Sequence, residues 1–234
     1  MRIRSFIIAY ALVLAILLFA DRRPAPISQG RYSHVIDLTG MPNEAARNSA
    51  LQTRATQKST LAAESRTRIV APDALIPGTW TAGQIPAERL IAPLVVMDLN
   101  VPELNASAAA NPQISLDDIA SWETQHGAIP QGAVVAVRRM GAPGELSSDA
   151  PPISADAAQF LMEARYTTGF AFETPVEFTT DRTLARQIAL HGNYVVEAAA
   201  RFTTLPATGS LIIVAPAKNK SAGRTPVRVL AMVR

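Results

Sequence analysis

The hydrophobic positions along the chain first indicate a set of short strands. Apolar runs rich in β-branched residues are bounded by Gly, Pro and polar residues, which is the pattern of strands. Several runs are apolar at consecutive positions, as in strands that are buried on both faces of a mixed sheet. The candidate strands are His34 to Thr39, Leu90 to Leu99, Gly132 to Arg139, Gly169 to Glu173, Tyr194 to Ala199, Ser210 to Ala215 and Pro226 to Val233.

Three segments carry the start and stop signals of helices instead. Residues 115–118 (SLDD) match a capping box and predict a helix that ends at Gly127. Ser154 caps a second helix, in which apolar residues recur at helical spacing. Leu184 to His191 predicts a third helix, which ends at Gly192. Helices interspersed with strands predict an α/β or α+β domain around one mixed sheet.

The N-terminal segment has a pattern of its own. Phe6 to Ala20 is an unbroken apolar run with arginines on both sides. Because the run has no polar stripe, it indicates a membrane or export signal rather than a core helix. A retained transmembrane helix is favoured over a cleaved signal peptide, since Leu18 and Ala20 provide only one of the two small residues that cleavage requires.

The charges beside this run favour one orientation. Two arginines precede the run and two follow it, but Asp21 offsets the second pair, which slightly favours a cytoplasmic amino terminus. We therefore expect residues 1–23 to form a single-pass anchor in the cytoplasmic membrane or a signal segment. Residues 24–32 form a linker, and residues 33–234 form a folded domain on the periplasmic side.

Composition and charge exclude some function classes. The net charge of +3 comes from 22 Lys+Arg and 19 Asp+Glu, but residues 1–23 hold four of the arginines and one aspartate, leaving 18 of each sign. A neutral domain with 6% aromatic residues has neither the basic surface nor the stacking rings of a nucleic-acid-binding protein. The sequence also has no nucleophile-elbow, phosphate-loop or dinucleotide-binding motif.

Stretches from most of the predicted domain carry a family resemblance. They are Val35 to Thr39, Thr67 to Leu99, Ile114 to Val137, Tyr194 to Glu197 and Leu205 to Val233. Together they resemble the cyclase family of metal-dependent hydrolases, to which bacterial kynurenine formamidases belong. The resemblance covers about residues 33 to 234 and implies a cyclase-like swivelling β/β/α fold, usually assembled as dimers or larger oligomers.

The resemblance does not extend to the family's metal-binding signature. That signature is His-x-Gly-Thr-His-x-Asp-x-Pro-x-His, whose side chains bind one or two divalent metals that activate water. When its proline is placed on Pro72, its ligand positions fall on Glu64, Arg68, Val70 and Ala74. The family's later glutamate matches Glu197, and its later histidine falls near Ala185.

These residues do not make a hydrolytic metal site. Such a site needs about three imidazole or carboxylate ligands and an open position for water. Val70 and Ala74 offer no donor atom, and Arg68 is a permanent cation that repels a metal ion. We therefore expect no catalytic, cofactor-binding or metal-binding residues. We also predict that Arg68 pairs with Glu64 or Glu197 in place of the metal.

The histidines and tryptophans have ordinary structural interpretations. His34 and His126 are expected at the surface or at a helix end. His191 is nearer to Glu197 in the sequence, so it is weighed as a displaced site histidine. Trp80 and Trp122 are expected in the core, with a partner surface as the alternative. Lys218 to Lys220 and Arg224 are expected at a solvated hairpin tip, where acidic lipid headgroups are a further alternative.

These observations support two functional hypotheses of different classes. The first is a non-catalytic, membrane-anchored subunit that binds and stabilises a larger membrane complex, such as a respiratory or photosynthetic assembly; a homodimer through the cyclase fold is also compatible. The alternative is a divergent exported metal-dependent hydrolase of small amides or esters, with Glu64, Glu197 and His191 as the remnants of a site. A third hypothesis is a ligand-binding pseudoenzyme that keeps the substrate pocket but catalyses no reaction.

Overall fold

The computed structural model describes residues 32–40, 67–100, 112–140, 151–176, 178, 182–218 and 223–234 of the 234-residue chain. Within this part of the chain, the strands are β1 (His34–Asp37), β2 (Arg68–Val70), β3 (Ile91–Asn100), β4 (Val134–Met140), β5 (Gly169–Phe172), β6 (Tyr194–Glu197), β7 (Ser210–Pro216) and β8 (Arg224–Val233). The helices are α4 (Pro72–Leu75), α5 (Leu116–His126), α6 (Ala155–Ala164) and α7 (Arg182–Leu190), with single turns at Ala82–Gln84, Ala87–Arg89 and Phe202–Thr204.

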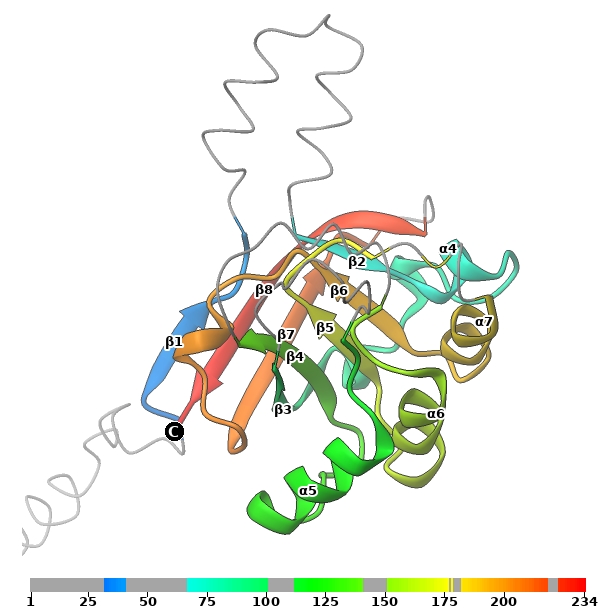
Figure 1. Cartoon of the computed structure of the whole chain (residues 1–234). Coiled ribbons are helices and arrows are strands. Elements are labelled where there is room, and N and C mark those ends of the chain that lie inside the picture. Colours follow the sequence, from blue (N-terminus) through cyan, green and yellow to red (C-terminus); the bar gives the residue numbers. More distant parts are fainter. Residues whose placement is uncertain are drawn as a thin grey trace, which may run out of the picture. The chain divides into compact units, whose positions relative to one another are not determined.

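One mixed sheet organises the domain (Figure 1). Its strand order is β1-β8-β2-β6-β5-β4-β3-β7, and β7 also pairs with β8, so seven strands close into a barrel-like sheet while β1 adds to an edge of β8. β3, β4, β5 and β6 are mutually parallel, and the other pairings are antiparallel. The closure is made by the pairing of β8 with β7. Along its other edge, β8 pairs with β2 through its first residues and with β1 through its last.

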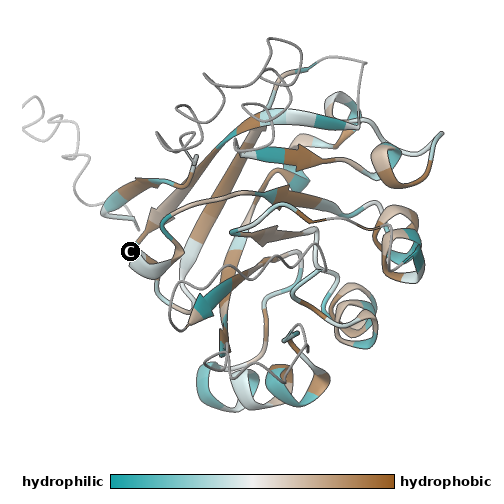
Figure 2. Ribbon diagram, turned by 45° about the horizontal axis from the view of Figure 1, so that its top comes forward, coloured by the Kyte–Doolittle hydropathy of each residue, from teal (hydrophilic) through white to brown (hydrophobic). Residues whose placement is uncertain are grey.

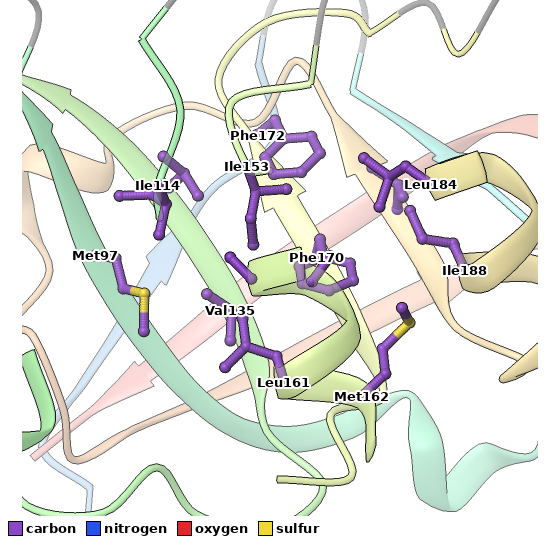
Figure 3. Packing of buried hydrophobic residues seen from close by; sticks show 14 of the residues in the cluster. Met97, Ile114, Val135, Ile153, Leu161, Met162, Phe170, Phe172, Leu184 and Ile188 are labelled. Atoms are coloured by element: carbon purple, nitrogen blue, oxygen red, sulfur yellow. The ribbon is translucent and has the colours of Figure 1, made fainter. Parts of the chain in front are cut away.

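Alternating residues of the strands build two hydrophobic cores, as the two-residue period of a strand requires. Leu94 and Val96 of β3 belong to the core inside the barrel, whereas Val95 and Met97 belong to the core beneath the helices. In Figure 3, Leu161 and Met162 of α6 and Leu184 and Ile188 of α7 contribute to the same cluster as Val135, Phe170 and Phe172 of the sheet. In Figure 2, hydrophobic residues are frequent along the strands, and the helices carry both hydrophobic and hydrophilic residues. The consecutive apolar residues of the sequence are therefore explained by burial on both faces.

Most of the expected elements are confirmed, with their ends shifted by one or a few residues. Ser115 caps α5 as expected: its hydroxyl accepts a hydrogen bond from the Asp118 backbone N–H at 3.3 Å, and the Asp118 carboxylate accepts from the Ser115 N–H at 2.8 Å. Gly127 follows α5 with a φ of 87°, a conformation that glycine adopts without strain. The third helix begins at Arg182, two residues before the predicted start.

Two elements beside the metal-signature stretch were not predicted. β2 has three residues and α4 has four, and neither is long enough to show a hydrophobic period. Pro72 occupies the first turn of α4, where its missing N–H costs no hydrogen bond. These two elements determine where the signature residues lie.

The predicted transmembrane helix stays a prediction. Phe6 to Ala20 and the linker 24–32, except for Tyr32, lie outside the described residues. Within the part of the chain that the structure describes, no helix is long and apolar enough to cross a membrane.

Candidate functional site

The pairing of three strands brings Arg68, Glu197 and Arg224 together. β2 lies between β6 and β8, which places Arg68 directly opposite Glu197 and Val70 opposite Arg224. Val70 and Val195 belong to the core beneath the helices. Because Arg68 and Glu197 are each two residues from one of these valines, they share the same face of the sheet. α4 and α7 contact each other beside this end of the sheet (Figure 1).

Glu197 is the centre of a buried polar cluster. Its Oε2 accepts a hydrogen bond from Arg68 Nη2 at 3.2 Å, and its Oε1 accepts one from the Val176 backbone N–H at 3.3 Å. Arg224 Nη2 lies 3.8 Å from Oε1 and donates to the Val176 carbonyl at 3.2 Å. The Glu197 side chain is 0% exposed, against 13% for Arg68 and 32% for Arg224. One fully buried carboxylate thus contacts two guanidinium groups.

The protonation of Glu197 reflects these opposing influences. Burial raises the pKa of the Glu197 carboxyl above its usual value, because it penalises the charged form. Arg224 and Arg68 oppose that rise by favouring the carboxylate. Arg68 Nε is also buried without a hydrogen-bond partner among the described residues. The cluster therefore depends on charge pairing, since either partner alone would be a buried and uncompensated ion.

This arrangement confirms one of the two predicted partners of Arg68. Glu197 pairs with it, whereas Glu64 lies outside the described residues. Arg224 corrects another expectation, because it is the first residue of β8 and contacts Glu197 instead of lying at a solvated hairpin tip. Lys218 is exposed, and residues 219–222 lie outside the described residues.

The donor set at this position does not fit the divalent metal that the family resemblance implies. Val70 is fully buried in the hydrophobic core, and Ala74 and Ala185 have only methyl side chains. Glu197 is held by arginines, so any cation placed beside it would face their positive charge. Across the described ranges, no group of three or more His, Cys, Asp or Glu residues is arranged to hold a metal ion.

A cavity of about 520 Å³ lies beside this cluster. Two of its walls come from the positions where the family signature would place histidines, namely Ala74 on α4 and Ala185 on α7. The described residues that line it are Ala74, Leu75, Ile76, Phe178, Arg182, Ala185, Arg186 and Arg224. Gly223 packs directly against the backbone and Cβ of Ala74, where any added side chain would collide with α4. The described walls of this cavity thus combine arginines, alanines and larger apolar side chains.

His191 does not belong to this cluster. Its Nδ1 lies 2.8 Å from the Gln187 carbonyl, and its Nε2 lies 3.8 Å from Glu163. His191 precedes β6, whereas Glu197 is the last residue of that strand. Since a strand rises about 3.3 Å per residue, β6 itself separates the two by roughly 10 Å. The interpretation of His191 as a displaced site histidine is therefore wrong.

The other singled-out side chains lie elsewhere. His34 and His126 are exposed, as expected. Trp122 is buried, and its Nε1 donates to the Val96 carbonyl at 2.9 Å, which confirms its core position. Trp80 is 39% exposed and lies near the guanidinium of Arg89, so its predicted core position is only partly correct.

Sequence reasoning missed two residues of the cavity, Arg182 and Arg186. They are four residues apart on α7, so they lie on one face of the helix. The sequence holds this signal, a pair of arginines one turn apart beside Ala185. Only the packing of α7 against α4 shows that they line a pocket.

The chain was also compared with known proteins. No curated protein matches it. Among solved structures, isatin hydrolase A from Ralstonia solanacearum is similar, with a TM-score of 0.62, 20% identity, and coverage of 96% of this chain and 97% of that one. Isatin hydrolase A from Labrenzia aggregata gives a TM-score of 0.58 at 23% identity, covering 96% and 99%.

A potential metal-dependent hydrolase with cyclase activity gives a TM-score of 0.58 at 22% identity, covering 86% of this chain and 98% of the other. At these identities the structural likeness shows the fold. The Cyclase family model matches residues 20–176, which is more than half of the chain. On that match and on the shared fold, this chain belongs to the cyclase family.

Proposed function

We propose that this chain is a non-catalytic member of the cyclase family. The observation that carries the proposal is the ion pair between Arg68 and Glu197, which occupies a position where the family signature would place a metal ligand. A guanidinium donates hydrogen bonds but has no lone pair for a metal ion. It also cannot lower the pKa of a water molecule in the way that a bound dication does. The fold is kept, and its hydrolytic machinery is replaced by a salt bridge.

The alternative, a divergent hydrolase of small amides or esters, has less support. It requires Glu197 and His191 to act on one substrate, and they lie at opposite ends of β6. It also requires Glu197 to be available as a ligand or base, although its two oxygens already contact Arg68, Arg224 and the Val176 N–H. The support for this alternative is the fold that the chain shares with hydrolases.

The same proposal includes attachment to a membrane. The apolar run Phe6 to Ala20 would anchor the chain in the cytoplasmic membrane, with the cyclase domain on the periplasmic side. A domain tethered in this way is well placed to bind and stabilise the other subunits of an integral membrane complex. A pair of cyclase domains is a second assembly compatible with the fold.

Metal analysis tests the loss of chemistry. The full chain is purified in a mild detergent, incubated with zinc or manganese, desalted and analysed for elements, and we expect no retained metal. Retention of about one or two equivalents that is lost in the Glu197→Gln variant would contradict the proposal, because it would show a working ligand set. Hydrolysis of a panel of aryl formamides and esters is measured on the same samples, with an expected rate equal to that of buffer.

Extraction and native mass test the membrane role separately. We expect the full chain to stay in the membrane fraction through an alkaline wash and to run, after mild detergent extraction, far above its mass of 25.0 kDa. A variant lacking residues 1–23 is the control and should be released without detergent. Release of the full chain by the alkaline wash would contradict the anchor, and a monomer-sized band would contradict the complex.

A further inference from the structure

The cavity beside the Arg68–Glu197 pair has an unusual charge. Arg182, Arg186 and Arg224 line it, and Arg68 lies on the neighbouring strand. Glu197 contacts two of these four guanidinium groups, those of Arg68 and Arg224. The described lining of the cavity includes three arginines and no carboxylate, so it carries an excess of positive charge.

The two arginines of α7 are the side chains available to a ligand. Arg182 and Arg186 are exposed, and neither has a carboxylate partner within the described ranges, whereas Arg224 contacts Glu197 and the Val176 carbonyl. Arg182 is also the first residue of α7, so the amino-terminal end of this helix lies at the cavity. The partial positive charge of that end has the same sign as the arginines.

The remaining walls are apolar. Leu75, Ile76 and Phe178 provide larger side chains, and Ala74 and Ala185 provide methyl groups. The volume of about 520 Å³ is within the ~300–1,000 Å³ range of small-molecule sites. The cavity therefore offers charged donors on one part of its wall and apolar surface on another.

We infer that this cavity binds a small organic oxyanion, with its carboxylate or phosphate group held by Arg182 and Arg186 and its apolar body against Leu75, Ile76 and Phe178. The planar guanidinium fork matches both oxyanions and binds them through paired, charge-assisted hydrogen bonds. The inference rests on the proposed function, since it assigns to arginines a ligand that a metal would otherwise hold. It makes this chain a binding protein with no hydrolytic step.

Calorimetric titration of the full chain in a non-ionic detergent, after treatment with a chelator, tests the inference. The probes are benzoate, phenyl phosphate and inorganic phosphate, and benzamide is the neutral match to benzoate. We expect benzoate, phenyl phosphate or both to bind and benzamide not to bind, and a comparison of the two anions identifies the preferred headgroup. Binding of inorganic phosphate with neither aryl anion would overturn the assignment of the apolar walls.

Charge-neutralising variants locate the site. Arg182→Gln and Arg186→Gln should each weaken binding at least about tenfold, or about 1.4 kcal/mol, because each variant removes a charge-assisted hydrogen bond to the anion. Arg228→Gln is the matched control, since Arg228 is an exposed arginine of β8 that pairs with Asp37 away from the cavity. Equal binding of benzamide, or unchanged affinity in both α7 variants, would overturn the inference.

Two further arms separate the reasons for a failure. Glu177 and Asp181 are next to Phe178 and Arg182 in the sequence. If binding appears only in the Glu177→Gln/Asp181→Asn variant, these acidic groups neutralise the arginines of the cavity in the wild-type chain. That result would overturn the inference. Binding that appears only after zinc is added would contradict the proposed function as well. No binding under any of these conditions would remove the oxyanion site alone and leave the loss of chemistry standing.

Discussion

Breaking the Arg68–Glu197 pair should destabilise the domain strongly. Removing one member of a buried ion pair leaves an uncompensated charge and costs about 3–5 kcal/mol, a large part of the roughly 5–15 kcal/mol that stabilises a typical domain. Glu197 is fully buried and contacts two arginines, whereas removal of Arg68 still leaves Arg224 beside the carboxylate. We therefore expect Glu197→Gln to cost more than Arg68→Met.

A double-mutant cycle measured by urea unfolding distinguishes this effect from a loss of packing. The Arg68→Met/Glu197→Gln double variant should lose less stability than the sum of the two single variants, because Arg68 is then not left without its carboxylate and only Arg224, which is 32% exposed, loses its partner. Arg228→Met is the control: its partner is Asp37, the two side chains are 67% and 38% exposed, and the expected loss is below about 1 kcal/mol. Additive single effects, or single losses no larger than that of the control, would refute the buried-pair argument. If a single variant does not fold, recovery of folding in the double variant gives the same answer.

Three further predictions concern the frame around the site. The Arg165 side chain holds the pKa of Glu123 below its usual 4.5, so the stability advantage of wild type over Glu123→Gln should be full above that value and vanish as the pH falls through the lowered pKa, as measured by urea unfolding at several pH values. Trp122→Phe removes a donor to a buried carbonyl and should cost about 1–3 kcal/mol in the same assay. Gly223→Ala should cost about 1–3 kcal/mol through its collision with α4, measured as a lower urea midpoint; an unchanged midpoint would contradict that packing.

The longer elements could be predicted because their signals are local. The capping box at residues 115–118 provides hydrogen-bond partners for backbone N–H groups at the start of α5 from within four residues. A short run of apolar residues bounded by turn residues is likewise enough to indicate a strand. β2 and α4 could not be predicted in this way, because both are too short to have a period of their own. Pairing with β6 and β8 stabilises β2, and α4 packs against α7. Barrel closure is also nonlocal, since it depends on β8 pairing with β7 along one edge and with β2 along the other.

The site shows the same division between local and nonlocal information. Arg68 could be identified as an obstacle to metal binding from its charge, and Glu197 could be named as one of two partners. The contribution of Arg224 could not be foreseen, because its place in the sequence resembled a loop end, and only antiparallel pairing with β2 brings it next to Glu197. The mistaken interpretation of His191 has the same cause: nearness in sequence does not bring together groups at opposite ends of one strand.

Under the proposed function, the arginine-lined pocket and the absence of a metal site follow from one electrostatic change. A divalent cation at the bottom of a pocket supplies positive charge that can attract an oxyanion, and an open coordination position in which water becomes a nucleophile. Arginines supply the first property without the second, because a guanidinium offers donor hydrogens and no coordination position. In this proposal, Glu197 offsets part of the positive charge of the Arg68 and Arg224 guanidinium groups that it contacts. A cyclase domain altered in this way would keep a preference for anions while losing the capacity to hydrolyse them, so the proposed ligand and the proposed absence of catalysis are two consequences of the same substitution.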